Sequence, residues 1–514
     1  MTRAKTQRHK DDLCTLAALR ELFPLFALSL VMAATASAQS TLIEGASVLD
    51  GLGGPARAVS VRFTGDKITE VGTLKPNPGE RLIDAKGLVL APGFIDVHNH
   101  SDRGFASDPA ATSQISQGIT TLVVGVDGGS TFPASEWFAQ RRSHPIAVNA
   151  LTFVGHATVR SRVMGGNYRR KASDAEIAKM AELVEQAMRD GALGLSTGLE
   201  YDVGSYSSTE EVIALAKAAA KLGGIYVSHV RDESDFAFDS FREVIRIATE
   251  AKLPCHISHI KLGTVAVWNK AAEAVQLIED ARRRGLDITA DFYPYDAWSS
   301  TITVMVPNKK YDDPASVKQA LADVGGPQNV TISYCSEHPN YEFKTLQQIA
   351  VMENMSAVDV FIRIVKDGGA SVVGHAMTSA DMREFFVQPW VMVASDGGIG
   401  MRHPRASGTF PRVLGRYVRD QHWASLPEAV RKMTSLPASR LGLKDRGVIR
   451  PGMKADLVLF DPATVIDQST FPEPARLSTG ISHVFVNGLE VWDGVRATTA
   501  RPGSTIARPA TERP

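Results

Sequence analysis

Cysteine is scarce in this chain of 514 residues, which has only Cys14, Cys255 and Cys335. So few cysteines exclude the disulfide framework that holds small secreted domains together. Two separate buried thiols at Cys255 and Cys335 are favoured over a single bridge, which an oxidising compartment would still allow. Stability must therefore come from apolar burial, and 44% hydrophobic residues are enough for a globular protein.

An excess of either charge is also missing, because 56 basic side chains balance 56 acidic ones. No basic block occurs beyond the amino terminus, so nothing indicates a nucleic-acid partner. Beyond the first 38 residues there is also no apolar run long enough to span a bilayer.

The amino-terminal segment has the order of a secretory signal. Basic residues are scattered through 1–20, an apolar stretch covers 22–34, and Ala-Ser-Ala follows at 36–38. This order predicts cleavage after Ala38, no stable membrane anchor afterwards, and a periplasmic or secreted mature chain. An uncleaved membrane anchor is the alternative.

Short strand patterns broken by glycine and proline occupy both ends of the remaining chain. Alternation at period two occurs in 39–91 and returns in 441–503. Two such segments most simply combine into one small β-sandwich domain. Residues 504–514 are predicted to be a tail.

The long central region, 92–440, alternates strand-like apolar runs with helical patterns. The predicted strands are 121–125, 147–154, 194–197, 225–229, 254–259, 288–293 and 391–395, and the helices are 174–189, 209–221, 239–251 and 270–284. This alternation predicts a (β/α)8 barrel. A doubly wound sheet is the fallback, but its glycine-rich phosphate loop is missing. Residues from about 300 to 350 lack this alternation of strand and helix patterns and are predicted to be an insertion over the barrel mouth.

Five polar side chains stand at or just after the ends of predicted strands, where a barrel carries its active site. They are His98 and His100, which follow an apolar run over 88–95, and His229, His259 and Asp396. Imidazole and carboxylate suit zinc or a similar ion, which lowers the pKa of a bound water to about 7. Asp396 is then the expected general base, moving a proton from water to the leaving amine.

Several strings resemble the amidohydrolase superfamily, and specifically its N-acyl-D-amino-acid deacylase (D-aminoacylase) branch. They are GFIDVHNH at 93–100, SHVRDE at 228–233, ISHIK at 257–261, DFYPY at 291–295, ASDG at 394–397, HPRASGTFPR at 403–412 and GVIRPGMKADL at 447–457. The resemblance runs from about residue 41 to 503. It implies a metal-dependent hydrolase of linear amides, built as a barrel with a β-sandwich.

The resemblance also implies roles for individual residues. His98 and His100 match the pair that binds one metal position, and His229 and His259 match the ligands of the other. Asp396 matches the catalytic aspartate. The remaining matches, Tyr293 and Arg405, are the positions that hold the α-carboxylate of the substrate, a task that suits a guanidinium.

One departure from the family concerns the loop after the second predicted strand. The family usually has a cysteine there that bridges or ligates metal, whereas this chain reads VGVDGGS at 124–130, with Asp127 in the cysteine's place. A carboxylate can bridge ions as a thiolate does. Because it is a harder ligand, we expect Asp127 to bind metal and to tolerate Mn2+ or Co2+ better beside Zn2+.

Three further residues are weaker candidates. His156, with Arg160, resembles a family loop near the substrate. Lys261 shares a strand face with His259, so it is expected to polarise the acyl carbonyl or to pair with a carboxylate. His375 ends another apolar run, but the family pattern assigns no role to this position.

The sequence thus predicts an enzyme that removes the acyl group from N-acyl-D-amino acids, with a small-molecule substrate that carries a free carboxylate. A dipeptidase acting on peptides with a carboxy-terminal D-residue would need the same carboxylate site. An inactive relative that only binds metal or ligand is the third interpretation. The side-chain preference, the number of ions and the oligomeric state do not follow from the sequence.

Overall fold

Eight parallel strands close into a barrel in the structure, a computed structural model that describes residues 40–508. They are β8 (Phe94–Asp96), β9 (Ile119–Val124), β10 (Asn149–Thr152) continued by β11 (Val154–Gly155), β12 (Gly194–Gly198), β13 (Ile225–His229), β14 (Cys255–Ile257), β15 (Ile288–Phe292) and β19 (Val391–Val393). A parallel bridge between Asn99 and Gly397 joins the first strand to the last. The predicted (β/α)8 barrel is confirmed.

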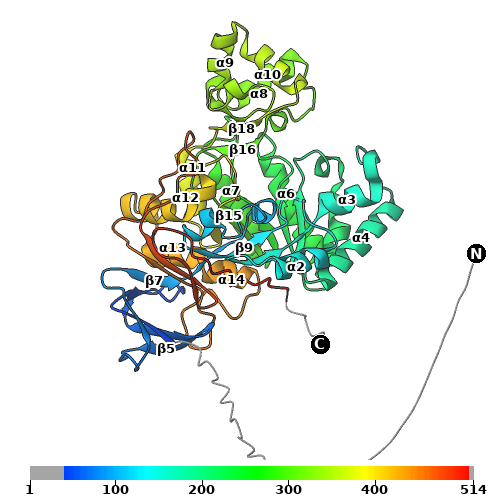
Figure 1. Ribbon diagram of the computed structural model, residues 1–514. Helices are drawn as coiled ribbons and strands as arrows, with labels where there is room; N and C mark the ends of the chain where they lie inside the picture. The colour runs from blue at the N-terminus through cyan, green and yellow to red at the C-terminus, as the bar shows by residue number, and fades with distance from the viewer. Residues whose placement is uncertain (1–39, 509–514) are drawn as a thin grey trace, which may run out of the picture. The chain divides into compact units, whose positions relative to one another are not determined.

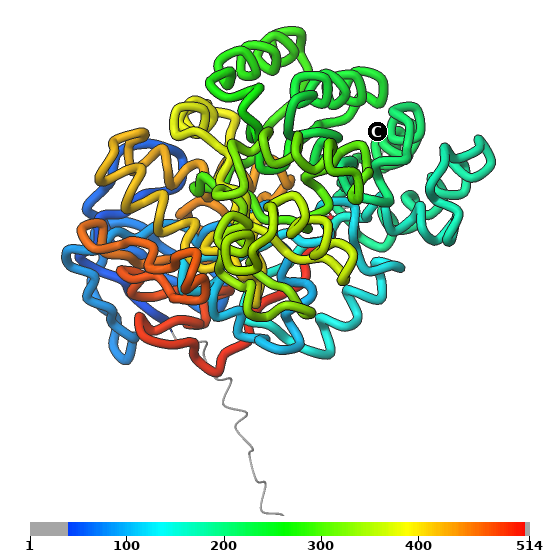
Figure 2. Tube along the Cα trace, turned by 90° about the horizontal axis from the view of Figure 1, so that it is seen from above, coloured from blue at the N-terminus to red at the C-terminus, as the bar shows by residue number. Residues whose placement is uncertain are grey.

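Helices connect the barrel strands and pack on them through apolar faces. They include α3 (His156–Met164), α4 (Asp174–Arg189), α5 (Thr209–Ala220), α6 (Ala237–Ala251), α7 (Ala271–Arg283), α11 (Ser379–Phe386), α12 (Arg405–Arg412), α13 (Leu426–Met433) and α14 (Ser435–Arg440). In α4, Ser173 and Glu176 form a capping box, and Met180, Val184 and Ala187 are buried on one face. Seen from above, the chain passes from cyan through green to yellow around the barrel (Figure 2).

Two sheets built from both chain ends form the predicted β-sandwich. The first sheet has the order β5 (Lys67–Gly72), β4 (Ser60–Thr64), β1 (Ser40–Glu44) and β6 (Arg81–Asp84). The second has β22 (Leu489–Trp492), β21 (Ile481–Val486), β20 (Leu457–Phe460), β7 (Val89–Pro92), β2 (Ser47–Val48) and β3 (Arg57–Ala58). Ile43, Phe63, Leu90, Leu457 and Phe485 fill the space between them.

The chain crosses from the sandwich to the barrel at Gly93. The sequence pattern shows one apolar run over 88–95, but the structure divides it between β7 and β8. A Cβ atom at Gly93 would lie 2.2 Å from the side chain of Thr120, so only glycine fits at this crossing.

A buried ion pair on the sandwich yields a stability prediction. Glu80 accepts hydrogen bonds from Arg62 Nε at 2.7 Å and Ser40 Oγ at 2.5 Å, and the Arg62 contact lowers the Glu80 pKa from 4.5 to about 2. We expect Glu80→Gln to lower the free energy of unfolding by about 1 to 2 kcal/mol at neutral pH. Because the folded pKa is depressed, the difference should shrink as pH falls from about 4.5 towards 2.

Urea titrations of both proteins across that pH range would measure this effect. Glu70→Gln is the matched control, since Glu70 also pairs with Arg62 but its side chain is 52% exposed, so its effect should be smaller. A loss for Glu80→Gln that does not change with pH would contradict the assignment.

The inserted unit is longer and more regular than its sequence suggests. It contains β16 (Trp298–Thr301), α8 (Pro314–Asp323), β17 (Val330–Tyr334), α9 (Leu346–Glu353), α10 (Ala357–Lys366) and β18 (Ser371–Gly374). It therefore ends near Gly374 rather than 350. Figure 1 shows α8, α9 and α10 grouped beyond β16 and β18. The unit has its own core, which includes Ile302, Val317 and Phe361.

The remaining predictions concern the cysteines, the tail and membrane segments. Cys255 and Cys335 are both buried and free, as favoured. The predicted tail begins with residues that pair with the barrel, because Ile506 N donates to Ala150 O at 2.9 Å. Among residues 40–508, helices of sufficient length and hydropathy to cross a membrane do not occur. The predicted signal segment lies outside the described residues.

Candidate active site

The residues predicted from strand ends meet at the carboxyl end of the barrel. His98 and His100 follow β8, His229 ends β13, His259 lies two residues beyond β14, and Asp396 lies three residues beyond β19. All except His100 are buried, and the His100 side chain is 26% exposed. The barrel thus assembles one cluster from loops that lie almost 300 residues apart in the chain.

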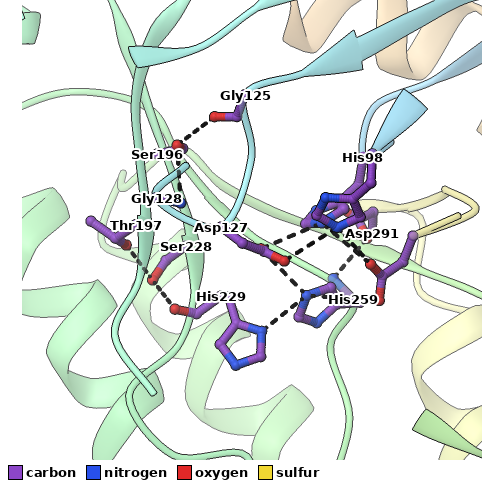
Figure 3. A network of polar contacts seen from close by, with 12 residues as sticks. His98, Gly125, Asp127, Gly128, Ser196, Thr197, Ser228, His229, His259 and Asp291 are labelled. Carbon is purple, nitrogen blue, oxygen red and sulfur yellow. Dashed lines mark hydrogen bonds and ion pairs between the residues drawn. The ribbon is translucent and has the colours of Figure 1, made fainter. Parts of the chain in front are cut away.

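Asp127 lies inside this cluster and contacts imidazoles from two strands. Its Oδ1 is 3.4 Å from His98 Nε2 and 3.7 Å from His259 Nε2, and its Oδ2 is 3.4 Å from His100 Nε2. Figure 3 shows Asp127 pointing towards His98 and His259 from the loop that begins at Gly125. A carboxylate so placed has the geometry of a bridging ligand.

The chemistry of this cluster fits a divalent cation. His98 Nε2 and Asp127 Oδ1 are buried, yet within the described residues neither has a hydrogen-bond partner. Buried polar atoms are normally paired, so two such atoms 3.4 Å apart have the arrangement of ligands to a cation. Ligand atoms of His98, Asp127, His259 and Asp396 all lie within 4.8 Å of one another.

Backbone strain is concentrated at the same residues. Asp127, His259 and Asp396 have positive φ angles of 53°, 34° and 46°. Such conformations cost energy in residues other than glycine, and they are kept where a side chain must be aimed at a site. All three side chains point into the cluster.

A second group of ligand atoms adjoins the first through His259. His229 Nδ1 lies 3.1 Å from His259 Nε2, and Glu233 Oε1 lies 2.9 Å from His259 Nδ1. Lys261 Nζ contacts both oxygens of Glu233, at 2.6 and 2.7 Å. Of the two roles predicted for Lys261, the structure shows the pairing with a carboxylate.

Arg405 and Tyr293 lie beside Asp396 and have unused donors. Arg405 Nη1 is 2.8 Å from Asp396 Oδ2, and its guanidinium lies 4.7 Å from the centre of the Tyr293 ring. Within residues 40–508, the buried Tyr293 Oη and Arg405 Nε have no hydrogen-bond partner. Both residues line a cavity together with His229, His259 and Asp396. These free donors suit an incoming carboxylate.

The charges in the cluster stabilise one another. Burial lowers the pKa of His100, but Asp127 and Asp396 outweigh it and raise this pKa to about 9. Burial likewise opposes ionisation of Asp396, yet Arg405 and His259 hold its pKa below the usual range. The carboxylate is therefore ionised at neutral pH. Because a cation must displace protons from the imidazoles, metal binding should weaken as pH falls.

Two buried aspartates hold the loops in place. Asp96 accepts hydrogen bonds from Ser395 N at 2.9 Å and from Asn99 Nδ2 at 2.9 Å, which ties the loop after β8 to the loop after β19. Asp291 accepts one from His259 N at 2.7 Å. The positions of His98, His259 and Asp396 thus depend on groups that do not face the cavity.

His156 does not lie where the sequence comparison predicted. Its imidazole is fully buried at the start of α3, where Nε2 lies 2.8 Å from Glu211 Oε1, and Arg160 pairs with the same carboxylate. His156 does not line the cavity that Arg405 and Asp396 share. The structure therefore corrects this prediction: His156 makes a buried contact with Glu211 and no substrate contact.

Among the cavity residues that sequence reasoning missed, three contact the histidines of the cluster. Glu200 Oε2 lies 2.8 Å from His229 Nε2, Tyr201 Oη lies 3.3 Å from His229 Nδ1, and Glu233 contacts His259. The available signal was their position, since Glu200 and Tyr201 lie two and three residues beyond β12 and Glu233 stands four residues after His229. Nothing in the sequence showed which side chains they would meet.

The family model described as "Amidohydrolase family" matches residues 81–298 and 375–491, and the gap between them corresponds to the inserted unit. A D-aminoacylase from Alcaligenes xylosoxydans xylosoxydans is 36% identical over 91% of this chain and 98% of its own length. An N-acyl-D-glutamate deacylase from the same organism is 34% identical over 91% of this chain and 96% of that protein.

A solved structure shows the same fold with a metal bound. The N-acyl-D-glutamate deacylase of Bordetella bronchiseptica, crystallised with zinc and a phosphonate inhibitor, superposes with a TM-score of 0.83 at 32% identity, covering 91% of this chain and 99% of that one.

Proposed function

The chain belongs to the amidohydrolase family, and we propose that it removes the acyl group from N-acyl-D-amino acids. One observation carries this assignment: a single cavity is lined by His229, His259, Asp396 and the free donors of Arg405 and Tyr293. In a substrate whose amide bond lies next to a free carboxylate, the amide would meet the histidines and Asp396 while the carboxylate meets Arg405 and Tyr293. The D-configuration rests on the deacylase relatives, which are 34 to 36% identical.

The protein's own residues divide the work of amide hydrolysis. Arg405 and Tyr293 bind the α-carboxylate and so fix the amide beside Asp396. Ionised Asp396 takes a proton from the attacking water and returns it to the leaving nitrogen. Lys261, held by Glu233, adds positive charge to the same cavity wall.

The enzyme depends on a divalent metal, for which zinc is the expected ion. His98, His100, Asp127, His229 and His259 would hold it, and when bound it lowers the pKa of water and polarises the acyl carbonyl. A purely binding role is not supported, because the full set of histidines is assembled around Asp396.

The decisive experiment is a substrate screen with the metal-loaded protein. We expect N-acetyl-D-amino acids to be hydrolysed faster than their L-isomers, activity to vanish on chelation, and added Zn2+ to restore it. Aminoacyl-D-amino acids belong in the same screen, since a dipeptidase would favour them. Hydrolysis of cyclic amides that lack a free carboxylate, and of nothing else, would refute the proposal.

Tyr293→Phe tests the carboxylate site. Because Tyr293 Oη has no other partner among the described residues, its loss should leave folding intact. We expect KM for N-acetyl-D-amino acids to rise about tenfold, the usual worth of a hydrogen bond to a charged group. The control substrate is the corresponding N-acetyl-D-amino acid amide, in which a carboxamide replaces the free carboxylate. Equal effects on both substrates would remove Tyr293 from the carboxylate site.

We also propose export of the chain with cleavage after Ala38. The support is the sequence alone, namely the apolar stretch 22–34 followed by Ala-Ser-Ala at 36–38. Amino-terminal sequencing of the protein from a periplasmic fraction should begin at Gln39. A mature protein that retains residues 1–38 would contradict the proposal.

A further inference from the structure

Acidic side chains outside the predicted ligand set also line this cavity. Glu200 follows β12, Asp232 and Asp235 belong to the loop between β13 and α6, and Asp323 is the last residue of α8. The barrel and the inserted unit therefore both supply carboxylates to this wall, which we call the acidic wall.

Three carboxylates of the acidic wall have only neutral partners. Asp232 accepts from two backbone N–H groups of its own loop, at 2.8 and 3.1 Å. Asp235 accepts from a threonine hydroxyl at 2.8 Å, and Asp323 from a glutamine amide at 2.6 Å. Within residues 40–508, none of the three forms an ion pair with a basic side chain.

Within residues 40–508, the lysine and arginine side chains that share a cavity with this wall are already engaged. Lys261 pairs with Glu233, Arg405 with Asp396, Arg231 with Glu243 and Lys309 with Asp202. Burial and, after it, the carboxylate of Glu200 raise the pKa of Asp232 to about 6. Burial and Asp235 likewise raise the pKa of Asp323. The wall is thus a group of like charges that a cation would relieve.

A second, independent observation points to a ligand in the same cavity. Tyr293 is 3% exposed and lines the cavity, and its buried Oη has no hydrogen-bond partner among the described residues. A carboxylate at Tyr293 and Arg405, together with a cation at the acidic wall, would satisfy both ends of the cavity. The acids by themselves would not define a site.

We propose that this cavity selects substrates that carry a positive charge in addition to their α-carboxylate. This inference rests on the proposed function and names its substrate class. The charge is an ammonium or guanidinium group, on the D-residue's side chain or as the free α-ammonium of an aminoacyl group. Apolar residues of the same cavity, Phe236, Val304 and Met305, provide contacts for a methylene stem.

Matched substrate pairs test the proposal with the metal-loaded protein. N-acetyl-D-lysine is compared with N-acetyl-D-norleucine, and glycyl-D-alanine with N-acetylglycyl-D-alanine. We expect kcat/KM to be about tenfold higher for the cationic member of one pair, and lowest for N-acetyl-D-glutamate. The preference should weaken with added salt, because screening reduces attraction at partly exposed carboxylates. A preference in the first pair would place the positive charge on the side chain of the D-residue, and a preference in the second pair would place it on the aminoacyl group.

The Asp323→Asn variant tests whether the acidic wall causes the preference for cationic substrates, because it leaves the catalytic residues unchanged. We expect kcat/KM for the preferred cationic substrate to fall about fivefold, with no change for its neutral counterpart. Asp312→Asn is the matched control, since this exposed residue precedes α8 in the same inserted unit and does not line the cavity.

The outcomes separate this inference from the proposed function. If neutral N-acyl-D-amino acids are hydrolysed at least as well as cationic ones, or if Asp323→Asn affects both members of a pair equally, the inference is overturned and the deacylase assignment stands. If the metal-loaded protein hydrolyses none of these D-compounds, the proposed function itself is overturned.

Discussion

The Asp396→Asn variant is expected to hydrolyse N-acyl-D-amino acids with a kcat at least about a thousandfold lower than that of the unmodified protein. Asparagine keeps the size of the side chain but cannot accept the proton that the attacking water must lose. It also removes the negative charge that pairs with Arg405 Nη1 at 2.8 Å. The loss should therefore fall on kcat.

Steady-state kinetics and product binding would test this expectation together. Because the variant frees Arg405 from its ionic partner, binding of the D-amino acid product should be unchanged or tighter. Thermal unfolding would show that the buried substitution has left the fold intact. A variant that keeps more than about a tenth of the original kcat would exclude Asp396 as the proton acceptor.

The Asp127→Ala variant is expected to bind metal about 10 to 100 times more weakly, with a matching loss of activity at low metal concentration. Asp127 contacts imidazole nitrogens from His98, His100 and His259 at 3.4 to 3.7 Å, so its removal leaves the cluster without its central carboxylate. Metal analysis after dialysis against Zn2+ would measure the change. Unchanged stoichiometry and affinity would contradict the assignment.

Asp127→Cys is the matched variant, because it restores the residue that the deacylase branch usually has at this position. A thiolate is a softer ligand than a carboxylate, so we expect Zn2+ binding to be retained and the relative affinity for Mn2+ to fall. Competition between the two ions, measured on both proteins, would show the change. Identical preferences would mean that Asp127 does not contact the metal.

Much of the fold followed from local pattern. The bounds of β13 and α4 coincide with the predicted segments 225–229 and 174–189. A strand buried on both faces is continuously apolar, and a barrel helix repeats its apolar positions every three to four residues, so each leaves a signal within a short window. The apolar run over 88–95 contains two strands, β7 of the sandwich and β8 of the barrel, and they divide it close to the predicted boundary between residues 91 and 92.

The candidate site was predictable in its residue types but not in its contacts. Strand ends and the family strings indicated His98, His229, His259 and Asp396, since a barrel collects such positions at one face. The same reasoning placed His156 near substrate, whereas the fold buries it against Glu211. Position after a strand does not say towards which neighbour a side chain turns.

The sequence by itself determined the barrel, the shared sandwich and the chemistry of the metal ligands, because period, composition and motif are properties of short segments. Only the tertiary structure decided that Asp127 meets three imidazoles, that Lys261 pairs with Glu233, and that Asp323 of the inserted unit joins the acidic wall. These contacts join residues far apart in the chain. They arise from strand order and loop conformation, which no single segment encodes.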